Sequence, residues 1–127
     1  MATSKLYLRA AAVYGGASVG AAAYGAHATQ DMDEVLKITY ANGNKLHMIH
    51  SAALMAGAGS VSALRFPKTT LALFAGGITV FSGSCYAAAL TGDRANGKLA
   101  PLGGTTLILA WLSLALLPIL NTVLLPS

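Results

Sequence analysis

Long apolar stretches alternate with short polar connections along the chain. The apolar stretches cover roughly residues 8–27, 46–64, 69–90 and 102–124. Each is close to the ~20 residues that a helix needs to cross the hydrocarbon core of a bilayer. No alternating apolar–polar pattern persists, as the strands of a membrane barrel would require. The pattern therefore predicts an all-α integral membrane protein, a four-helix bundle whose single four-span transmembrane domain covers residues 1–127.

The connection between the first two stretches has a different character. Four of its residues fall at helical spacing: Met32, Val35, Leu36 and Thr39. Asp31 followed by Glu34 resembles a capping box that opens a helix. We therefore expect an amphipathic segment at the membrane surface between helices one and two. Asn42-Gly43 either interrupts the chain before the second helix or lies within one continuous helix.

The first 28 residues share features with a targeting sequence. Lys5 and Arg9 precede an apolar run, and no acidic residue occurs before Asp31. A basic start, an apolar run and small residues at Ala26-His27-Ala28 are typical of a secretory signal. We expect the segment to be retained as the first helix. Its Ala, Gly and Ser content predicts that it inserts poorly into a membrane without the other helices.

Small residues recur on the predicted helices. Gly16 and Gly20 form a GxxxG motif in the first helix. In lipid, helices associate through close backbone approach, which small residues permit. The glycines predicted to pack helices together are Gly16, Gly20, Gly57, Gly76, Gly83, Gly103 and Gly104. We favour packing within one chain over oligomerisation as the role of these positions.

Composition agrees with a bilayer environment and excludes several functions. Hydrophobic residues make up 55% of the chain and charged residues 9%, whereas a soluble domain carries about 25% charged residues. The net charge of +4 comes from basic residues scattered singly, so no nucleic-acid partner is expected. Cys85 is the only cysteine, which excludes a paired-cysteine redox enzyme. The four acidic residues all lie in connections, which argues against a proton-coupled exporter.

The polar residues suggest one candidate site. Tracing four spans puts His27, His47 and His50 on one side of the membrane, with Ser84 and Tyr86 near the same level. These five residues form a predicted polar pocket at one end of the bundle. Polar side chains at such a depth are expected to face the bundle interior and find partners.

A second pattern follows if helix two is continuous. In that case one polar stripe runs along it, through Tyr40, Asn44, His47 and Ser51.

The histidines allow two interpretations. The functional one is haem or metal binding at His27 and His50, or quinone binding in the pocket, because neutral histidine is the commonest metal ligand. The structural one, which we favour, is that the histidines bond to backbone carbonyls and fix the bundle. No carboxylate or cysteine stands beside His47 and His50 within the helix. We therefore predict no metal ligands, no cofactor and no catalytic residues, with structural lipids as the expected bound molecules.

Several motifs together resemble one family. They are Tyr24–His27, Ala41, His50–Leu54, Phe81–Tyr86, Ala89–Gly92, Ala100–Gly104 and Ala110–Leu112. In this order they are similar to the transmembrane protein 256 family, also called domain of unknown function 423. The resemblance implies four spans, an inner membrane in bacteria and mitochondria in eukaryotes. It implies importance, without a chemical role, for His27, His50, Ser84, Tyr86, Pro101 and Gly103.

A non-enzymatic role follows as the leading expectation. With almost no mass outside the membrane, the chain is expected to act as an accessory or structural subunit of a larger complex. A respiratory-chain complex of an energy-transducing membrane, such as the mitochondrial inner membrane, is the setting we expect. Its predicted partners are membrane lipid and other membrane-protein subunits. The alternatives are a haem, metal or quinone binding protein and, less favoured, an oligomeric small carrier.

Overall fold

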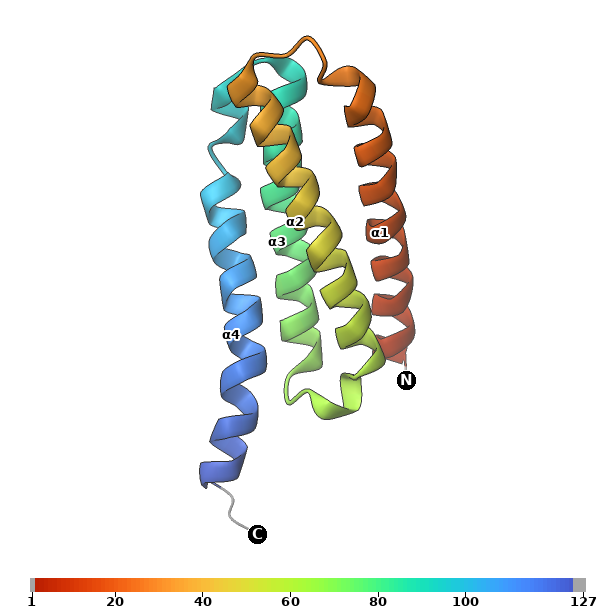
Figure 1. The fold of residues 1–127 in the computed structure, drawn as a ribbon. Coiled ribbons are helices and arrows are strands. Elements are labelled where there is room, and N and C mark those ends of the chain that lie inside the picture. Colours follow the sequence, from red (N-terminus) through yellow and green to blue (C-terminus); the bar gives the residue numbers. More distant parts are fainter. Residues whose placement is uncertain (1, 125–127) are drawn as a thin grey trace.

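Four long helices run up and down in a bundle (Figure 1). The computed structural model describes the backbone of residues 2–124 and the side chains of residues 2–115. The helices are α1 (Ala2–Ala28), α2 (Glu34–Gly59), α3 (Pro67–Thr91) and α4 (Ala100–Leu124), with short 3₁₀ turns η1 (Val61–Ala63) and η2 (Arg94–Gly97). No strand occurs in the described part of the chain. The predicted all-α fold is confirmed.

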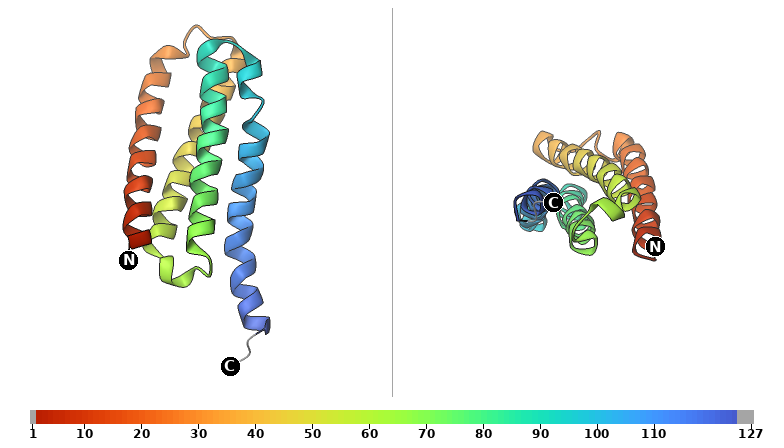
Figure 2. Two further views of the ribbon diagram at one scale, coloured as in Figure 1. Left: turned by 180° about the vertical axis from the view of Figure 1, so that it is seen from behind. Right: turned by 90° about the horizontal axis from the view of Figure 1, so that it is seen from below.

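The helices pack mainly in chain order. α2 packs against α1 and α3, and α3 packs against α2 and α4. α1 and α4 lie at the two outer edges, as the front and end-on views show (Figures 1 and 2). α1 contacts α3 only slightly, so the two helices leave an opening on one side of the bundle.

Apolar side chains occupy both the interior and the outer surface. Leu54, Leu71 and Phe74 are fully buried at the centre, where α2, α3 and α4 meet. Many large apolar side chains on the outer helices are exposed, among them Val13 at 72% and Ile108 at 60%. Continuous apolar surface of this kind is unfavourable in water and matches a lipid environment.

Two helices are long and apolar enough to cross a bilayer by length and composition. They are Pro67–Thr91 and Arg94–Ala115, in a search of the described residues alone. Crossing by α1 and α2 as well stays a prediction. Both helices contain more small or polar residues than α3 and α4, which lowers their hydropathy.

The amphipathic segment is the first part of α2. The helix begins at Glu34 rather than near Leu46 and passes through Asn42-Gly43 without a break. A Cβ atom at Gly43 would lie 2.6 Å from the Cβ atom of Cys85. This glycine therefore lets α2 and α3 approach closely in the middle of a helix, where a glycine otherwise lowers stability.

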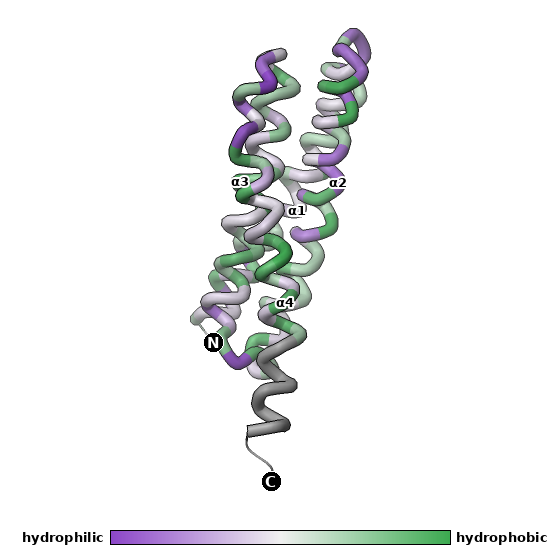
Figure 3. Tube along the Cα trace, turned by 90° about the vertical axis from the view of Figure 1, so that its left-hand side faces the viewer, coloured by the Kyte–Doolittle hydropathy of each residue, from purple (hydrophilic) through white to green (hydrophobic). Residues whose placement is uncertain are grey.

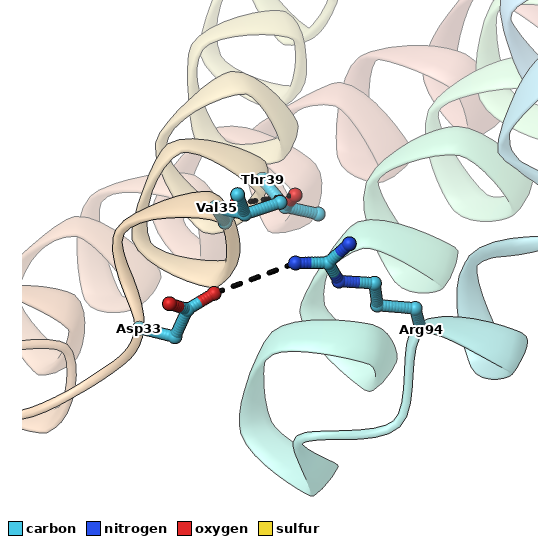
Figure 4. Close-up of polar contacts among 4 residues, drawn as sticks. All are labelled: Asp33, Val35, Thr39 and Arg94. Atoms are coloured by element: carbon cyan, nitrogen blue, oxygen red, sulfur yellow. Dashed lines mark hydrogen bonds and ion pairs between the residues drawn. The ribbon is translucent and has the colours of Figure 1, made fainter.

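The predicted capping box is wrong. Asp33, not Asp31, is the N-cap residue of α2, and its side chain makes no capping hydrogen bond. Its carboxylate instead lies 3.5 Å from the guanidinium of Arg94 (Figure 4). The pair is exposed, so it contributes little stability. It joins the α1–α2 connection to η2.

Charged residues are concentrated at the end of the bundle where the α1–α2 and α3–α4 connections meet. The hydropathy-coloured trace shows hydrophilic segments at this end (Figure 3). All four acidic residues belong to it: Asp31, Asp33, Glu34 and Asp93. We call this region the polar end. Its composition agrees with a position outside the hydrocarbon core.

The signal-like segment forms an integral helix of the bundle. Along α1, backbone carbonyls accept hydrogen bonds from α2: Ala21 O from Tyr40 and Ser18 O from Asn44. Near its start, Ser4 Oγ donates to Ala58 O at 2.8 Å. α1 is therefore fixed to α2 over most of its length.

The glycines divide into two groups. A Cβ atom at Gly57 would lie 2.6 Å from Leu71, and one at Gly103 would lie 2.7 Å from the Cα atom of Phe81. Gly104 is less tightly packed, with the Phe81 ring at 3.6 Å.

Packing within the chain was wrongly predicted for the other four glycines. Nothing lies within 4 Å of a Cβ atom built at Gly16, Gly20, Gly76 or Gly83. All four positions are exposed, and Gly83 faces the space between α1 and α3. Gly16 and Gly20 do form a GxxxG motif in the sequence. Residue spacing alone, however, does not reveal whether that face of the helix contacts another helix or lipid.

Candidate functional site

The five residues of the predicted pocket do not lie together. His27 is exposed in the last turn of α1, at the polar end. His47 and His50 are buried midway along α2. The prediction placed them beside His27 because it began the second helix at Leu46. Since α2 begins at Glu34, both histidines move toward the centre of the bundle.

His50 faces α4, and both of its ring nitrogens make hydrogen bonds. Its Nδ1 lies 2.7 Å from Leu46 O, and its Nε2 accepts the indole N–H of Trp111 at 3.0 Å. A carbonyl only accepts hydrogen bonds, so Nδ1 carries the hydrogen. The Trp111 ring also meets Phe74 edge to face at 5.3 Å. His50 therefore connects α2 to α4.

His27 and His50 do not lie together as a pair of ligands in this arrangement. Both ring nitrogens of His50 are already hydrogen-bonded, and His27 lies at the polar end. Among the described residues, no group of three or more His, Cys, Asp or Glu side chains is placed to hold a metal ion.

The polar stripe of α2 is present as predicted. Tyr40, His47 and Ser51 are buried, and Asn44 is half-buried. Tyr40 donates to Ala21 O at 2.5 Å. The stripe forms because α2 is continuous, which keeps the i, i+4, i+7, i+11 positions on one face.

A hydrogen-bond network joins three helices around His47. Asn44 Nδ2 donates to Ser18 O on α1 at 2.9 Å and to the Tyr86 hydroxyl on α3 at 3.2 Å. The same hydroxyl lies 2.9 Å from His47 Nδ1. Tyr86 is near the end of α3, but side chains on a helix point toward its N-terminus. Its hydroxyl therefore reaches the middle of the bundle.

The other ring nitrogen of His47 has no partner. Nε2 is buried and makes no hydrogen bond with any described residue. Tyr14 stands edge-on beside the ring, with centroids 6.2 Å apart. The Tyr14 main chain also lies close to the imidazole, but it does not complete a hydrogen bond with Nε2. A buried unpaired N–H or nitrogen lone pair costs about 1–3 kcal/mol, so this atom requires an explanation.

His47 lies in the wall of a pocket between α1 and α3. The pocket has a volume of about 290 Å³. Its lining residues are Val13, Tyr14, Ala17, His47, Ile78, Thr79, Ser82, Gly83 and Tyr86. We call it the α1–α3 groove. It lies at the level of Ile78 and Thr79, midway along α3, so in a bilayer crossed by α3 it opens toward hydrocarbon.

The other polar side chains in this wall have partners. Ser82 Oγ donates to Gly43 O at 2.7 Å, and Thr79 Oγ1 donates to Ala75 O at 2.9 Å. The Tyr14 hydroxyl lies 3.2 Å from the same Ala75 oxygen. Among the described groove residues, His47 Nε2 is thus the one buried side-chain nitrogen or oxygen without a hydrogen-bond partner.

Two residues of the predicted pocket, Ser84 and Tyr86, differ in position, and one groove residue, Tyr14, was not predicted. Tyr86 belongs to the groove, whereas Ser84 is buried but does not line it; its backbone carbonyl lies 3.9 Å from a Cβ position built at Gly97 in η2. Tyr14 was missed. It is the one aromatic side chain in a run of small residues from 10 to 23. This position as a single aromatic residue among small ones was the sequence feature that could have identified Tyr14.

Comparisons with known proteins identify relatives over most of the chain. The family described as "Protein of unknown function (DUF423)" matches residues 21–104. A UPF0382 membrane protein of Haemophilus influenzae is 33% identical over 113 residues, 86% of this chain and 90% of that protein. YwdK, a UPF0382 membrane protein of Bacillus subtilis, is 29% identical over 119 residues, 85% of this chain and 91% of that protein. No solved structure matches the chain.

These relatives confirm the resemblance seen in the motifs. A further UPF0382 membrane protein, from Staphylococcus epidermidis, is 34% identical over 103 residues, 78% of this chain and 83% of that protein. Such bacterial proteins agree with an integral protein of the inner or plasma membrane, but they do not bear on a mitochondrial or respiratory-chain role. With the family pattern matched over residues 21–104 and membrane proteins aligned over most of its length, the chain belongs to the DUF423 family of membrane proteins.

Proposed function

We propose that this membrane protein binds one small apolar molecule in the α1–α3 groove. The supporting observation is the buried, unpartnered Nε2 atom of His47 in the wall of an apolar pocket. Buried polar atoms in proteins nearly always have a partner. A polar atom on an otherwise apolar bound molecule would supply the missing partner, as no described side chain does.

The size of the groove limits the ligand. A protein cavity of about 150 Å³ accommodates benzene, and most ligand pockets measure about 300–1,000 Å³. At about 290 Å³, the groove fits one ring with its substituents and is too small for haem. The lateral opening leaves room for an alkyl chain to extend into lipid.

Filling the groove tests this function. Gly83 lines the groove, whereas Gly76 does not, and both have open space at the Cβ position. Gly83→Leu should therefore fill the groove without disturbing the fold, and Gly76→Leu is the matched control. We expect native mass spectrometry of the purified protein to show one apolar molecule per chain for the natural protein and for Gly76→Leu. Gly83→Leu should lose it.

Two results would contradict the proposal. One is that the natural chain carries no small molecule and shows no saturable binding of either decylbenzene or decyl-1,4-benzoquinone in nanodiscs. The other is that Gly83→Leu retains the same molecule at the same stoichiometry as Gly76→Leu. A visible absorption band would indicate a coloured ligand.

The second candidate function is association with another membrane protein through α1. Gly16 and Gly20 have open space at their Cβ positions, and the neighbouring Val13 and Val19 are exposed. A GxxxG face of this kind supports close approach by a helix of a partner. An accessory-subunit role in an energy-transducing membrane would use this face.

Bulky residues at the two glycines test association separately from ligand binding. We expect Gly16→Leu with Gly20→Leu to leave the chain folded and to abolish co-migration with a larger complex on a native gel in mild detergent. Gly76→Leu, at an exposed glycine of α3 outside the groove, is the control. A natural chain that migrates alone would refute the partner role.

A further inference from the structure

We propose that the α1–α3 groove selects a ligand with an uncharged hydrogen-bond acceptor, a carbonyl-type oxygen, which receives the Nε2–H of His47. This proposal rests on the proposed function, because it requires an occupant of the groove. It adds the chemistry of that occupant. The hydrogen-bond network around His47 carries the inference.

The network begins at Asn44. Its side-chain atom beside Ser18 O must be the amide nitrogen, because a backbone carbonyl only accepts. The same nitrogen lies 3.2 Å from the Tyr86 hydroxyl and donates to it. The two hydrogens of this amide are therefore used, one by Ser18 O and one by Tyr86.

Tyr86 then fixes the tautomer of His47. Its oxygen accepts from Asn44, so its single hydrogen is available for His47 Nδ1 at 2.9 Å. Nδ1 consequently accepts, and in a neutral imidazole the other nitrogen carries the hydrogen. His47 Nε2 is then a donor, and the Tyr14 main chain beside the ring does not complete a hydrogen bond with it.

The opposite tautomer is less favourable. If Nδ1 carried the hydrogen and donated to Tyr86, the Tyr86 hydrogen would have no acceptor among its described partners, Asn44 and His47. Nε2 would lack a donor as well. Two unsatisfied groups replace one, and each buried unsatisfied group is costly. His47 and His50 thus hold opposite tautomers on the same helix.

A donor at Nε2 narrows the chemistry of the ligand. A protonated ring nitrogen has no lone pair for a metal ion, so haem iron and free metals are not the preferred occupants. None of the residues lining the groove is charged, and an unpaired ion is strongly disfavoured in such surroundings. The partner that remains is a neutral oxygen acceptor on an apolar body.

Two sources can supply such an oxygen. One is a mobile lipid-soluble carbonyl compound, such as a quinone. The other is the ester carbonyl of a membrane lipid. The groove lies midway along α3, whereas ester carbonyls lie at the edge of a hydrocarbon core about 30 Å thick. This depth favours the mobile compound, and the experiment separates the two.

The experiment uses full-length chain with ¹⁵N-labelled histidine in nanodiscs of ether-linked phosphatidylcholine, which has no ester carbonyl. Nitrogen NMR distinguishes protonated from unprotonated ring nitrogens. The probes are decyl-1,4-benzoquinone, which offers a carbonyl, and decylbenzene, which is similar in size and does not. We expect His47 to carry its hydrogen on Nε2, and the quinone to bind about tenfold more tightly than decylbenzene.

Variants assign the preference to His47. His47→Leu should bind both probes equally, and His47→Gln, which keeps an N–H donor, should retain part of the preference. Tyr86→Phe removes the hydroxyl that fixes the tautomer, so both His47 nitrogens should become partly protonated. His27→Gln, at the exposed polar end, should behave as the natural chain. Circular dichroism establishes that each variant is folded.

The outcomes separate this inference from the proposed function. If neither probe binds, the proposed function fails and the inference fails with it. If both bind equally while His47 is unaffected, the groove binds apolar molecules and the inference is overturned. A quinone preference that persists in His47→Leu also overturns it. A shift of the His47 signal in ester-linked but not ether-linked nanodiscs, without a probe, supports it and identifies lipid as the source.

Discussion

Adjacent glycines at the start of α4 have unequal surroundings. A Cβ atom at Gly103 would overlap the backbone of Phe81, whereas one at Gly104 would make ordinary contact with the Phe81 ring at 3.6 Å. We expect Gly103→Ala to lower the free energy of unfolding by about 1–3 kcal/mol, the typical cost of overpacking. Gly104→Ala should be neutral or stabilising, by up to about 1 kcal/mol of helix propensity. Unfolding in sodium dodecyl sulfate, followed by Trp111 fluorescence, measures both. Equal effects would contradict the α3–α4 geometry.

Trp111 and His50 provide a second prediction at the residue scale. Trp111→Phe preserves an aromatic ring against Phe74 but removes the N–H that His50 Nε2 accepts. Polar contacts between membrane helices contribute about 0.6–1.7 kcal/mol, so we expect a destabilisation of that size. Loss of helical circular dichroism during denaturation measures it. Tyr24→Phe, at an exposed residue of α1, is the control and should leave the unfolding curve unchanged.

Features of single residues that depend only on helical periodicity were predicted correctly from the sequence. The stripe from Tyr40 to Ser51 followed from helical spacing along one helix. The grouping of His27 with His50 failed because it depended on the level of each residue in the bundle, which requires the starting point of α2. The direction of His50 toward Trp111 depends on contacts between α2 and α4. No single-helix pattern contains that information.

At the scale of the element, the starting point of α2 accounts for most of the difference between expectation and structure. The apolar stretch beginning at Leu46 marks where hydropathy rises, whereas the helix begins at Glu34. Backbone hydrogen bonds continue through Gly43, whose missing side chain is compensated by close contact with Cys85. Hydropathy therefore predicted the existence of four helices better than the limits of the second.

The composition of α1 predicts that its insertion depends on the other helices. It is rich in Ala, Gly and Ser, and it is not among the helices apolar enough to cross a bilayer by composition. We expect residues 2–28 alone to insert poorly in a translocon assay, because small residues gain little from transfer into lipid. Residues 67–91, which form α3, should insert efficiently as the control. Efficient insertion of the isolated α1 segment would refute this dependence.

At the scale of the whole molecule, the question is whether all four helices cross the membrane. α2 packs extensively against both α1 and α3, yet only α3 and the described part of α4 have sufficient hydropathy. A four-span bundle places the α1–α2 connection on the same side as η2. A two-span hairpin, with α1 and α2 outside the bilayer, places that connection on the side of η1 instead.

Single cysteines distinguish these topologies. In a Cys85→Ala background, we expect Gln30→Cys and Asn96→Cys to react with a membrane-impermeant maleimide from one side of the membrane. Ser62→Cys should react from the opposite side. All three positions are exposed, so accessibility does not limit labelling. Reaction of Gln30→Cys from the side of Ser62→Cys would instead favour the two-span hairpin. Such a result would also place the α1–α3 groove outside the hydrocarbon core. A lipid-soluble ligand would then no longer reach His47 from the bilayer.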